Sequence, residues 1–118
     1  MNWPNKILNM NKKDYKVVND NLRKYFNPMK RHDLNMVKLN THNTFEHEIK
    51  KCAVAFKLLQ GGATIITEGI LKNGKRPDIV VLDVSPPIVY EIMVSEKEES
   101  IINKAKYYYD MRIQKVRI

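Results

Sequence analysis

Apolar side chains recur at helical spacing in two separate stretches of the chain. The first stretch is residues 12–26, where an apolar stripe runs between lysine and arginine side chains. The stripe consists of Tyr15, Val18, Leu22 and either Tyr25 or Phe26. We expect an amphipathic helix that packs on the main domain, and its basic side could also neutralise the phosphates of a nucleic acid.

The second stretch lies between Thr44, whose hydroxyl can cap a helix, and Gly61-Gly62, which can end one. Its apolar positions are Phe45, Ile49, Cys52, Ala53, Phe56 and Leu59. This spacing predicts a helix whose apolar face is made of these residues.

The residues that follow combine short β-branched stretches with turn signals, which is typical of strands. Strands are predicted at residues 63–71, 79–82, 88–94 and 115–118, and a further helix is predicted at residues 96–110. Asn73-Gly74 predicts a tight hairpin between the first two strands, and Pro86-Pro87 interrupts the chain before the third. The order helix, three strands, helix, strand predicts an α/β core in residues 44–118, after a basic N-terminal extension of residues 1–43.

Length and charge narrow the class of protein. The chain has 118 residues, enough for one domain, and 21 Lys and Arg against 13 Asp and Glu give a net charge of +8. Residues 1–40 hold nine basic and three acidic side chains, so +6 of the excess lies there. A single cysteine excludes an internal disulfide, and no apolar run approaches the roughly 20 residues that span a bilayer. We expect a soluble, intracellular (cytoplasmic) protein without redox chemistry.

Two carboxylates stand out because of their surroundings. Asp78 follows Pro77 at the start of the second predicted strand, and Glu91 lies inside the apolar third strand. Burying a carboxylate is costly, so a cation, a donor or a metal must compensate Glu91. If the two strands are neighbours, both carboxylates can meet at one edge of the sheet and bind Mg²⁺ or Mn²⁺. Alternatively, Asp78 caps a turn after the hairpin and Glu91 pairs with Arg76 or a lysine.

The residues around these acids resemble a known family. An Arg-Pro-Asp motif ends at Asp78, and a Tyr-Glu-Ile-Met motif contains Glu91, with one helix before them and a helix and strand after them. Over residues 44–118 this arrangement is similar to the PD-(D/E)XK nuclease superfamily, which includes restriction endonucleases, archaeal Holliday-junction resolvases and repair nucleases. The resemblance implies a restriction-endonuclease-like α-β-β-β-α-β core, with a mixed central sheet flanked by helices. It also implies one or two bound Mg²⁺ ions and hydrolysis of phosphodiester bonds in nucleic acid.

The family's catalytic lysine is missing from its usual place. That lysine usually lies two residues after the second acid, where this chain has Met93. Some subfamilies carry it on the following helix, four residues before a tyrosine and after a strand that ends Glu-x-x-x-Ser. The stretch that starts at Glu91 and the tyrosine four residues after Lys104 match this pattern, so the resemblance implies Lys104. Lys97 and Lys106 are alternatives, and all three lysines could instead be solvated.

The superfamily often completes its metal site with an acid from the first helix. Glu48 lies at the border of the predicted apolar face and is favoured over Glu46 on the opposite border. Either acid could instead pair with a lysine on the next turn, Glu48 with Lys51 or Glu46 with Lys50. Glu68 could be a further partner of the site or only a charge on an edge strand.

Other chemistry has weaker support in the sequence. His32, His42, His47 and Cys52 match no zinc-finger or ribbon spacing. No phosphate-cradling glycine loop and no dinucleotide fingerprint is present. Of the tyrosines at positions 107–109, at most one or two can share a surface, so core packing explains them better than base stacking.

These features predict a metal-dependent endonuclease that cleaves DNA. Asp78, Glu91 and Lys104 would be catalytic, and Asp78, Glu91 and Glu48 would hold Mg²⁺ or Mn²⁺. Basic side chains would bind the DNA backbone without reading sequence, namely Lys13, Lys16, Arg23, Lys24, Lys72, Lys75 and Arg76. Duplex cleavage or Holliday-junction resolution needs two cuts, so we expect a homodimer, with no membrane and no organic cofactor.

Two other functions fit the sequence. One is a catalytically inactive nuclease-fold module that binds nucleic acid or assembles with a partner, which Met93 favours. The other is a protein-interaction domain whose basic arm meets an acidic partner.

Overall fold

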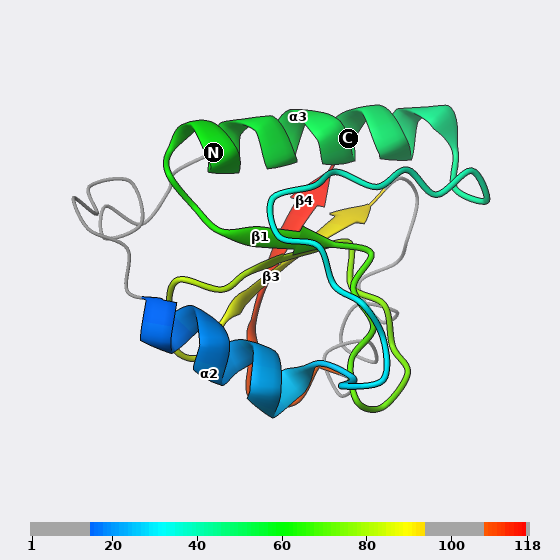
Figure 1. Cartoon of the computed structure of the whole chain (residues 1–118). Coiled ribbons are helices and arrows are strands. Elements are labelled where there is room, and N and C mark those ends of the chain that lie inside the picture. Colours follow the sequence, from blue (N-terminus) through cyan, green and yellow to red (C-terminus); the bar gives the residue numbers. More distant parts are fainter. Residues whose placement is uncertain (1–14, 94–107, 118) are drawn as a thin grey trace.

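The computed structural model of this protein describes residues 15–93 and 108–117. These residues form two helices and a four-stranded mixed sheet, which confirms the predicted α/β class. The helix α2 (Tyr15–Tyr25) lies on one side of the sheet and α3 (Phe45–Gln60) on the other (Figure 1). Predictions for residues 1–14, 94–107 and 118, including most of the helix expected at 96–110, lie outside the described residues.

The strands follow one another across the sheet in chain order. They are β1 (Ile65–Thr67), β2 (Ile79–Val81), β3 (Ile88–Met93) and β4 (Arg112–Arg117). The pairs β1–β2 and β2–β3 are antiparallel, and β3–β4 is parallel. Gly74 has a φ of 84° at the tip of the β1–β2 connection, where the sequence predicts a turn.

Several predicted element boundaries are wrong. The first strand ends at Thr67 rather than at residue 71, because Glu68 takes a left-handed φ of 54° that cannot continue a strand. The last strand begins at Arg112, earlier than the predicted residue 115. Residues 108–110, predicted as the end of a helix, form a bend and turn in which Tyr109 has a φ of 58°.

Strand residues alternate between two hydrophobic clusters, one on each side of the sheet. The cluster on the α3 side includes Val54, Leu58, Ile65, Ile79 and Ile92. The cluster on the α2 side includes Val18, Phe26, Val80, Val89 and Tyr108. The strands β1, β2 and β3 are therefore buried on both faces, which accounts for their continuous apolar sequence.

The buried face of α3 is not the face predicted from the sequence. Its buried positions are His47, Glu48, Lys51, Val54, Ala55 and Leu58. On the predicted face, Phe45, Ile49 and Phe56 are 75%, 52% and 65% exposed. Only the second half of the helix packs on the apolar cluster, whereas the first half directs polar side chains toward a cavity at the end of the sheet. Hydrophobic spacing alone selects the wrong face.

The helix α2 packs on the sheet as expected, with Val18 and Tyr25 buried. Tyr15, at the start of the predicted stripe, is exposed. The Tyr25 hydroxyl donates a hydrogen bond of 2.5 Å to Asp110, which ties the helix to the turn before β4.

Asn21 fastens α2 to the segment after β2, because its amide nitrogen donates to the backbone oxygens of Leu82 and Val84, each at 2.9 Å. Removing this buried donor in Asn21→Ala should lower the free energy of unfolding by about 1–3 kcal/mol. Asn19→Ala changes the same residue type at an exposed position of the same helix and should have an effect below about 0.5 kcal/mol. Urea unfolding of both variants measures the difference, and equal losses would contradict the anchoring role.

Candidate functional site

One end of the sheet gathers charged side chains from separate parts of the chain. Asp78 directly precedes β2, Glu91 lies in β3, and Glu68 directly follows β1. With the start of α3, these segments surround a cavity of about 380 Å³. Its titratable lining includes His47, Glu68, Lys75, Arg76, Asp78 and Glu91. The structure therefore places both acids that the sequence singles out on the wall of one cavity.

Asp78 is held by the neighbouring strand and by α3. Its Oδ2 accepts a hydrogen bond from the backbone N–H of Ile92 at 2.8 Å and lies 3.3 Å from His47 Nε2. Because Ile92 follows Glu91 in the chain, the backbone of β3 fixes Asp78 relative to the second acid. The two carboxylates are thus parts of one rigid arrangement.

Glu91 is buried within β3 and is compensated in part by a neutral donor. Its Oε1 accepts a hydrogen bond of 2.5 Å from the hydroxyl of Tyr108. Tyr108 packs in the cluster on the α2 side and also lines the cavity. Core packing, which the sequence favours for this tyrosine, is confirmed, and the contact with Glu91 adds a second role.

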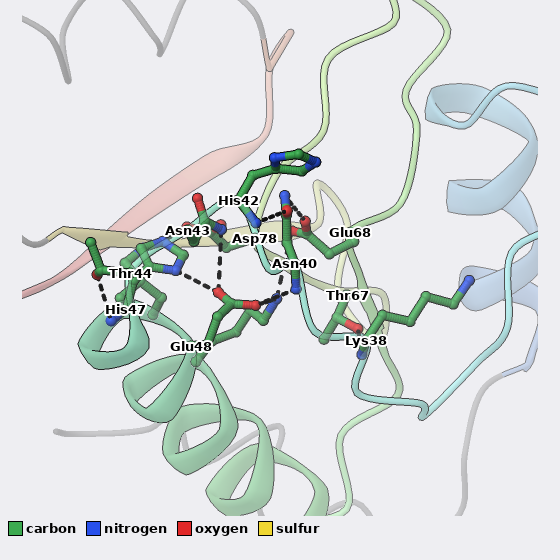
Figure 2. A network of polar contacts seen from close by, with 12 residues as sticks. Lys38, Asn40, His42, Asn43, Thr44, His47, Glu48, Thr67, Glu68 and Asp78 are labelled. Atoms are coloured by element: carbon green, nitrogen blue, oxygen red, sulfur yellow. Dashed lines mark hydrogen bonds and ion pairs between the residues drawn. The ribbon is translucent and has the colours of Figure 1, made fainter.

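Glu48 is enclosed by neighbouring polar groups (Figure 2). Its Oε1 accepts a hydrogen bond of 2.6 Å from the backbone N–H of Asn40 and lies 2.6 Å from Lys51 Nζ. Its Oε2 lies 3.2 Å from Asn43 Nδ2 and 2.7 Å from His47 Nδ1. Burial alone would raise the pKa of Glu48, but these contacts outweigh it and lower the pKa to about 2.

The surroundings of Glu48 show a supporting role for this acid. The pairing with Lys51 that the sequence left open is present, and Glu48 is not among the residues that line the cavity. It contacts His47, which in turn reaches Asp78. Glu48 therefore orients the side chains beneath the cavity, and its predicted role as a metal ligand stays a prediction.

Lys51 is fully buried, with an exposed fraction of 0%. Its Nζ lies 2.6 Å from Glu48 Oε1 and 3.8 Å from Glu68 Oε2, so one ammonium group is shared by two carboxylates. The geometry is that of an ion pair rather than of a well-aligned hydrogen bond. Since an unpaired buried ammonium is strongly unfavourable, the two carboxylates compensate the burial of Lys51.

Glu68 is only partly compensated by its neighbours. Its side chain is 8% exposed, and its Oε1 accepts a hydrogen bond of 2.9 Å from Asn40 Nδ2. Burial raises the pKa of Glu68, and the nearby charges of Asp78 and Glu48 raise it further, against the opposing effects of Lys51 and Asn40. A carboxylate in this state would be stabilised by an additional cation.

The predicted nucleic-acid-binding residues occupy several places. Lys75 and Arg76 line the cavity. Arg23 and Lys72 line a separate hollow of about 330 Å³ near the end of α2. Lys16 pairs with Asp20 at 3.2 Å, and Lys24 pairs with Asp110 at 3.7 Å. Lys13, Lys97, Lys104 and Lys106 lie outside the described residues.

Sequence reasoning did not place His47 or Lys51 in the site. Both residues share a helix face with the buried Val54 and Leu58, at spacings of three, four and seven residues. The sequence did contain a signal for this placement, because the two polar residues line up with apolar residues farther along the same helix face. It indicates a helix that passes from a polar site onto an apolar core.

The carboxylates that line the cavity are suitable ligands for a divalent metal, but among the described residues they do not belong to a larger group of ligands. Among residues 15–93 and 108–117, no group of three or more His, Cys, Asp or Glu side chains is arranged to hold a metal ion, so His32, His42, His47 and Cys52 form no such group. Mg²⁺, however, is commonly held by only one or two carboxylates and keeps several waters. The oxygens of Asp78 and Glu91 on one cavity wall meet that requirement.

Comparisons of the chain with family models, curated proteins and solved structures find no match. Within the part of the chain that the structure describes, neither helix is long and apolar enough to cross a membrane. Function therefore has to be inferred from the geometry of the site.

Glu48→Gln tests whether the network beneath the cavity stabilises the fold. Because the folded state lowers the pKa of Glu48 from 4.5 to about 2, the charged form contributes stability above pH 4.5 that is lost as the pH falls toward 2. We expect the variant to lose roughly 2 kcal/mol of unfolding free energy at neutral pH, and less in acid.

Urea unfolding at neutral pH and in acid measures this difference. Asp20→Asn is the matched control, because Asp20 is an exposed acid paired with Lys16 on α2, and it should change stability by less than about 0.5 kcal/mol. A loss in Glu48→Gln that stays constant down to strongly acidic pH would show that the charge of Glu48 is not the source.

Proposed function

We propose that this protein is a metal-dependent endonuclease that hydrolyses phosphodiester bonds in DNA. The observation that carries the proposal is the cavity where Asp78 and Glu91, from adjacent segments of the sheet, lie together with Lys75 and Arg76. Carboxylate oxygens suit a hard divalent cation, and the basic pair attracts a phosphate. Both requirements of metal-assisted phosphodiester hydrolysis are met at one place.

The arrangement of the described elements supports a restriction-endonuclease-like core. The helix α3 precedes three consecutive antiparallel strands, and β4 then returns parallel to β3. A parallel return needs a crossover of about a dozen or more residues, usually helical, and residues 94–111 provide the length. The order of the described elements is compatible with the α-β-β-β-α-β core that the sequence resemblance implies, whose second helix would fall within residues 94–107, outside the described residues.

In the proposed mechanism, Asp78 and Glu91 would be the residues that hold Mg²⁺ or Mn²⁺. A divalent cation at this position would activate water and neutralise charge on the phosphate. The Ile92 N–H and His47 keep the Asp78 carboxylate in place, while Tyr108 orients Glu91. Preorganised ligands of this kind do not have to reorient during the reaction, which lowers its barrier.

We assign to Lys104, in the connection between β3 and β4, the role of stabilising the charge that develops on the phosphate. Met93, at the family's usual lysine position, is buried and is not among the residues that line the cavity. Of the lysines that the structure describes, Lys75 lines the cavity and competes for this role.

A row of basic hollows extends from the cavity and supports binding of a nucleic-acid strand. A hollow of about 410 Å³ shares Arg76 with the cavity and is also lined by Arg31 and Lys38. The hollow of about 330 Å³ near α2 shares His32 with this second hollow and is also lined by Lys72. The phosphate backbone would follow this row, with affinity but without sequence readout.

The first test is cleavage of labelled duplex, single-stranded and four-way-junction DNA with Mg²⁺, Mn²⁺ or chelator. We expect cleavage that needs metal and that falls at least about 100-fold in Asp78→Asn, which keeps the side-chain shape but loses the charge. Asp20→Asn on α2 removes an exposed acid outside the cavity and should cleave like the wild type. Binding of DNA without cleavage under every condition would overturn the enzyme proposal.

The same assay separates the two lysines. A group that stabilises developing charge lowers kcat when it is removed, whereas a group that only binds phosphate raises KM. We expect Lys104→Ala to lower kcat and Lys75→Ala to raise KM. The reverse pattern would assign the catalytic role to Lys75.

The second candidate function is a nuclease-fold module that binds nucleic acid or a partner without cleaving it. The buried Met93 in the family's lysine position favours this alternative. Thermal melting with Mn²⁺ distinguishes the two, because a preformed carboxylate site gains stability when it binds metal. A module that has lost its metal site shows no such gain.

Arg76→Ala tests the proposed backbone path. Arg76 lines both the cavity and the adjoining hollow, so the variant should bind every DNA sequence more weakly and reduce the slope of log K against log salt by about 1. Lys16→Ala should change binding less, because Lys16 is already paired with Asp20. Salt titrations of fluorescence anisotropy measure both slopes, and equal effects of the two variants would contradict this path.

A further inference from the structure

The outward face of α3 carries an apolar stripe with the spacing of a coiled-coil seam. Phe45, Ile49, Cys52, Phe56 and Leu59 follow one another at intervals of four, three, four and three residues. Three of them, Phe45, Ile49 and Phe56, are exposed, and the other two are partly buried. A stripe of two positions in every seven is narrow for a helix on a sheet but is typical of helix-on-helix packing.

Of the stripe residues, only Leu59 packs against the core that the structure describes. Val54, Ala55 and Leu58 already pack α3 against the sheet from its other side. Large apolar side chains that remain exposed in a contiguous row mark an interaction surface. Figure 1 shows α2 on the opposite side of the sheet from α3, so α2 does not cover this helix.

Charged residues beside the stripe indicate which kind of partner it binds. Glu46 near the start of the helix and Lys57 near its end lie in the next row, and both are exposed. In an antiparallel pair of identical helices centred on Cys52, Glu46 of each copy lies opposite Lys57 of the other, and Ile49 lies opposite Phe56. A parallel pair would instead bring like charges together.

We infer that two copies of this chain associate through antiparallel α3 helices, about a twofold axis near Cys52. Such an interface is self-complementary, so one stripe is sufficient to form it and it closes as a dimer. The opposite side of the same helix carries His47, which lines the cavity, so association would fix two cavities relative to each other. Only this last consequence, which suits an enzyme that makes two cuts, rests on the proposed function.

Cross-linking of the full chain tests the position of the axis. Cys52 is the single cysteine, so a short bis-maleimide can join two chains only through this residue. We expect a covalent dimer on a denaturing gel from the wild type and none from Cys52→Ser. A wild type that stays monomeric in sedimentation and yields no cross-link would overturn the inference, as when residues 1–14 or 94–107 of the same chain cover the stripe.

Charge exchange tests the antiparallel direction. Glu46→Lys and Lys57→Glu should each weaken the dimer by about 3- to 10-fold, while the double variant should return close to wild-type affinity. Phe56→Glu should weaken it by at least about 100-fold, because a charge would be buried unpaired, and Met29→Glu, at an exposed apolar position outside α3, should not.

Sedimentation equilibrium without DNA or metal gives these affinities, so failure here is distinguishable from failure of the nuclease proposal. A double variant weaker than either single variant would refute the antiparallel pairing. Dimers unaffected by Phe56→Glu would refute the interface.

Discussion

A lysine ammonium with no exposure persists in a protein interior only beside negative charge, and this requirement organises the candidate site. The Nζ of Lys51 lies 2.6 Å from Glu48 Oε1 and 3.8 Å from Glu68 Oε2, so α3 and the end of β1 are held against each other. Glu48 also contacts His47, which reaches Asp78 at the start of β2. One continuous set of contacts thereby draws three separate elements to the same end of the sheet, and the cavity forms where they meet.

Within this cluster of charges, the pKa values of two neighbouring carboxylates are shifted in opposite directions. Burial raises the pKa of both, but Glu48 has enough donors to bring its pKa down to about 2, whereas the pKa of Glu68 stays raised. The charged form of Glu48 therefore stabilises the fold, while that of Glu68 opposes folding once the pH rises above 4.5 and through its raised pKa. Glu68 is the one of the two that lines the cavity. A bound cation would recover the stability that this charge removes, so a metal ion at the proposed site would be coupled to folding through this acid.

The sequence predicted the parts of the fold that depend on local signals. Thr44 and Gly61 define the ends of α3, and the Asn73-Gly74 turn lies between β1 and β2. Asp78 directly precedes β2, and Glu91 lies in the neighbouring strand β3. The burial of Lys51 was not predictable in this way. It depends on Glu68, which is distant in the sequence and takes a left-handed backbone conformation that no propensity suggests. A prediction from hydrophobic periodicity places lysine on the surface. It therefore assigned the apolar stripe of α3 to the core, although much of that stripe is exposed.

That wrong assignment and the proposed interface have one physical origin, which is that α3 is apolar on the side away from its site. If burial alone governed the inward face, an apolar residue at position 51 would serve, since a buried ion pair is often replaceable by well-packed apolar groups without loss of stability. Replacing Lys51 alone, however, would leave Glu48 and Glu68 without their shared cation. The carboxylates of the site therefore require a cation at position 51, on the side of α3 that faces the site. The apolar stripe lies on the other side of the helix. On the outward side Phe45, Ile49 and Phe56 stay exposed, and this is the surface that the proposed dimer would bury.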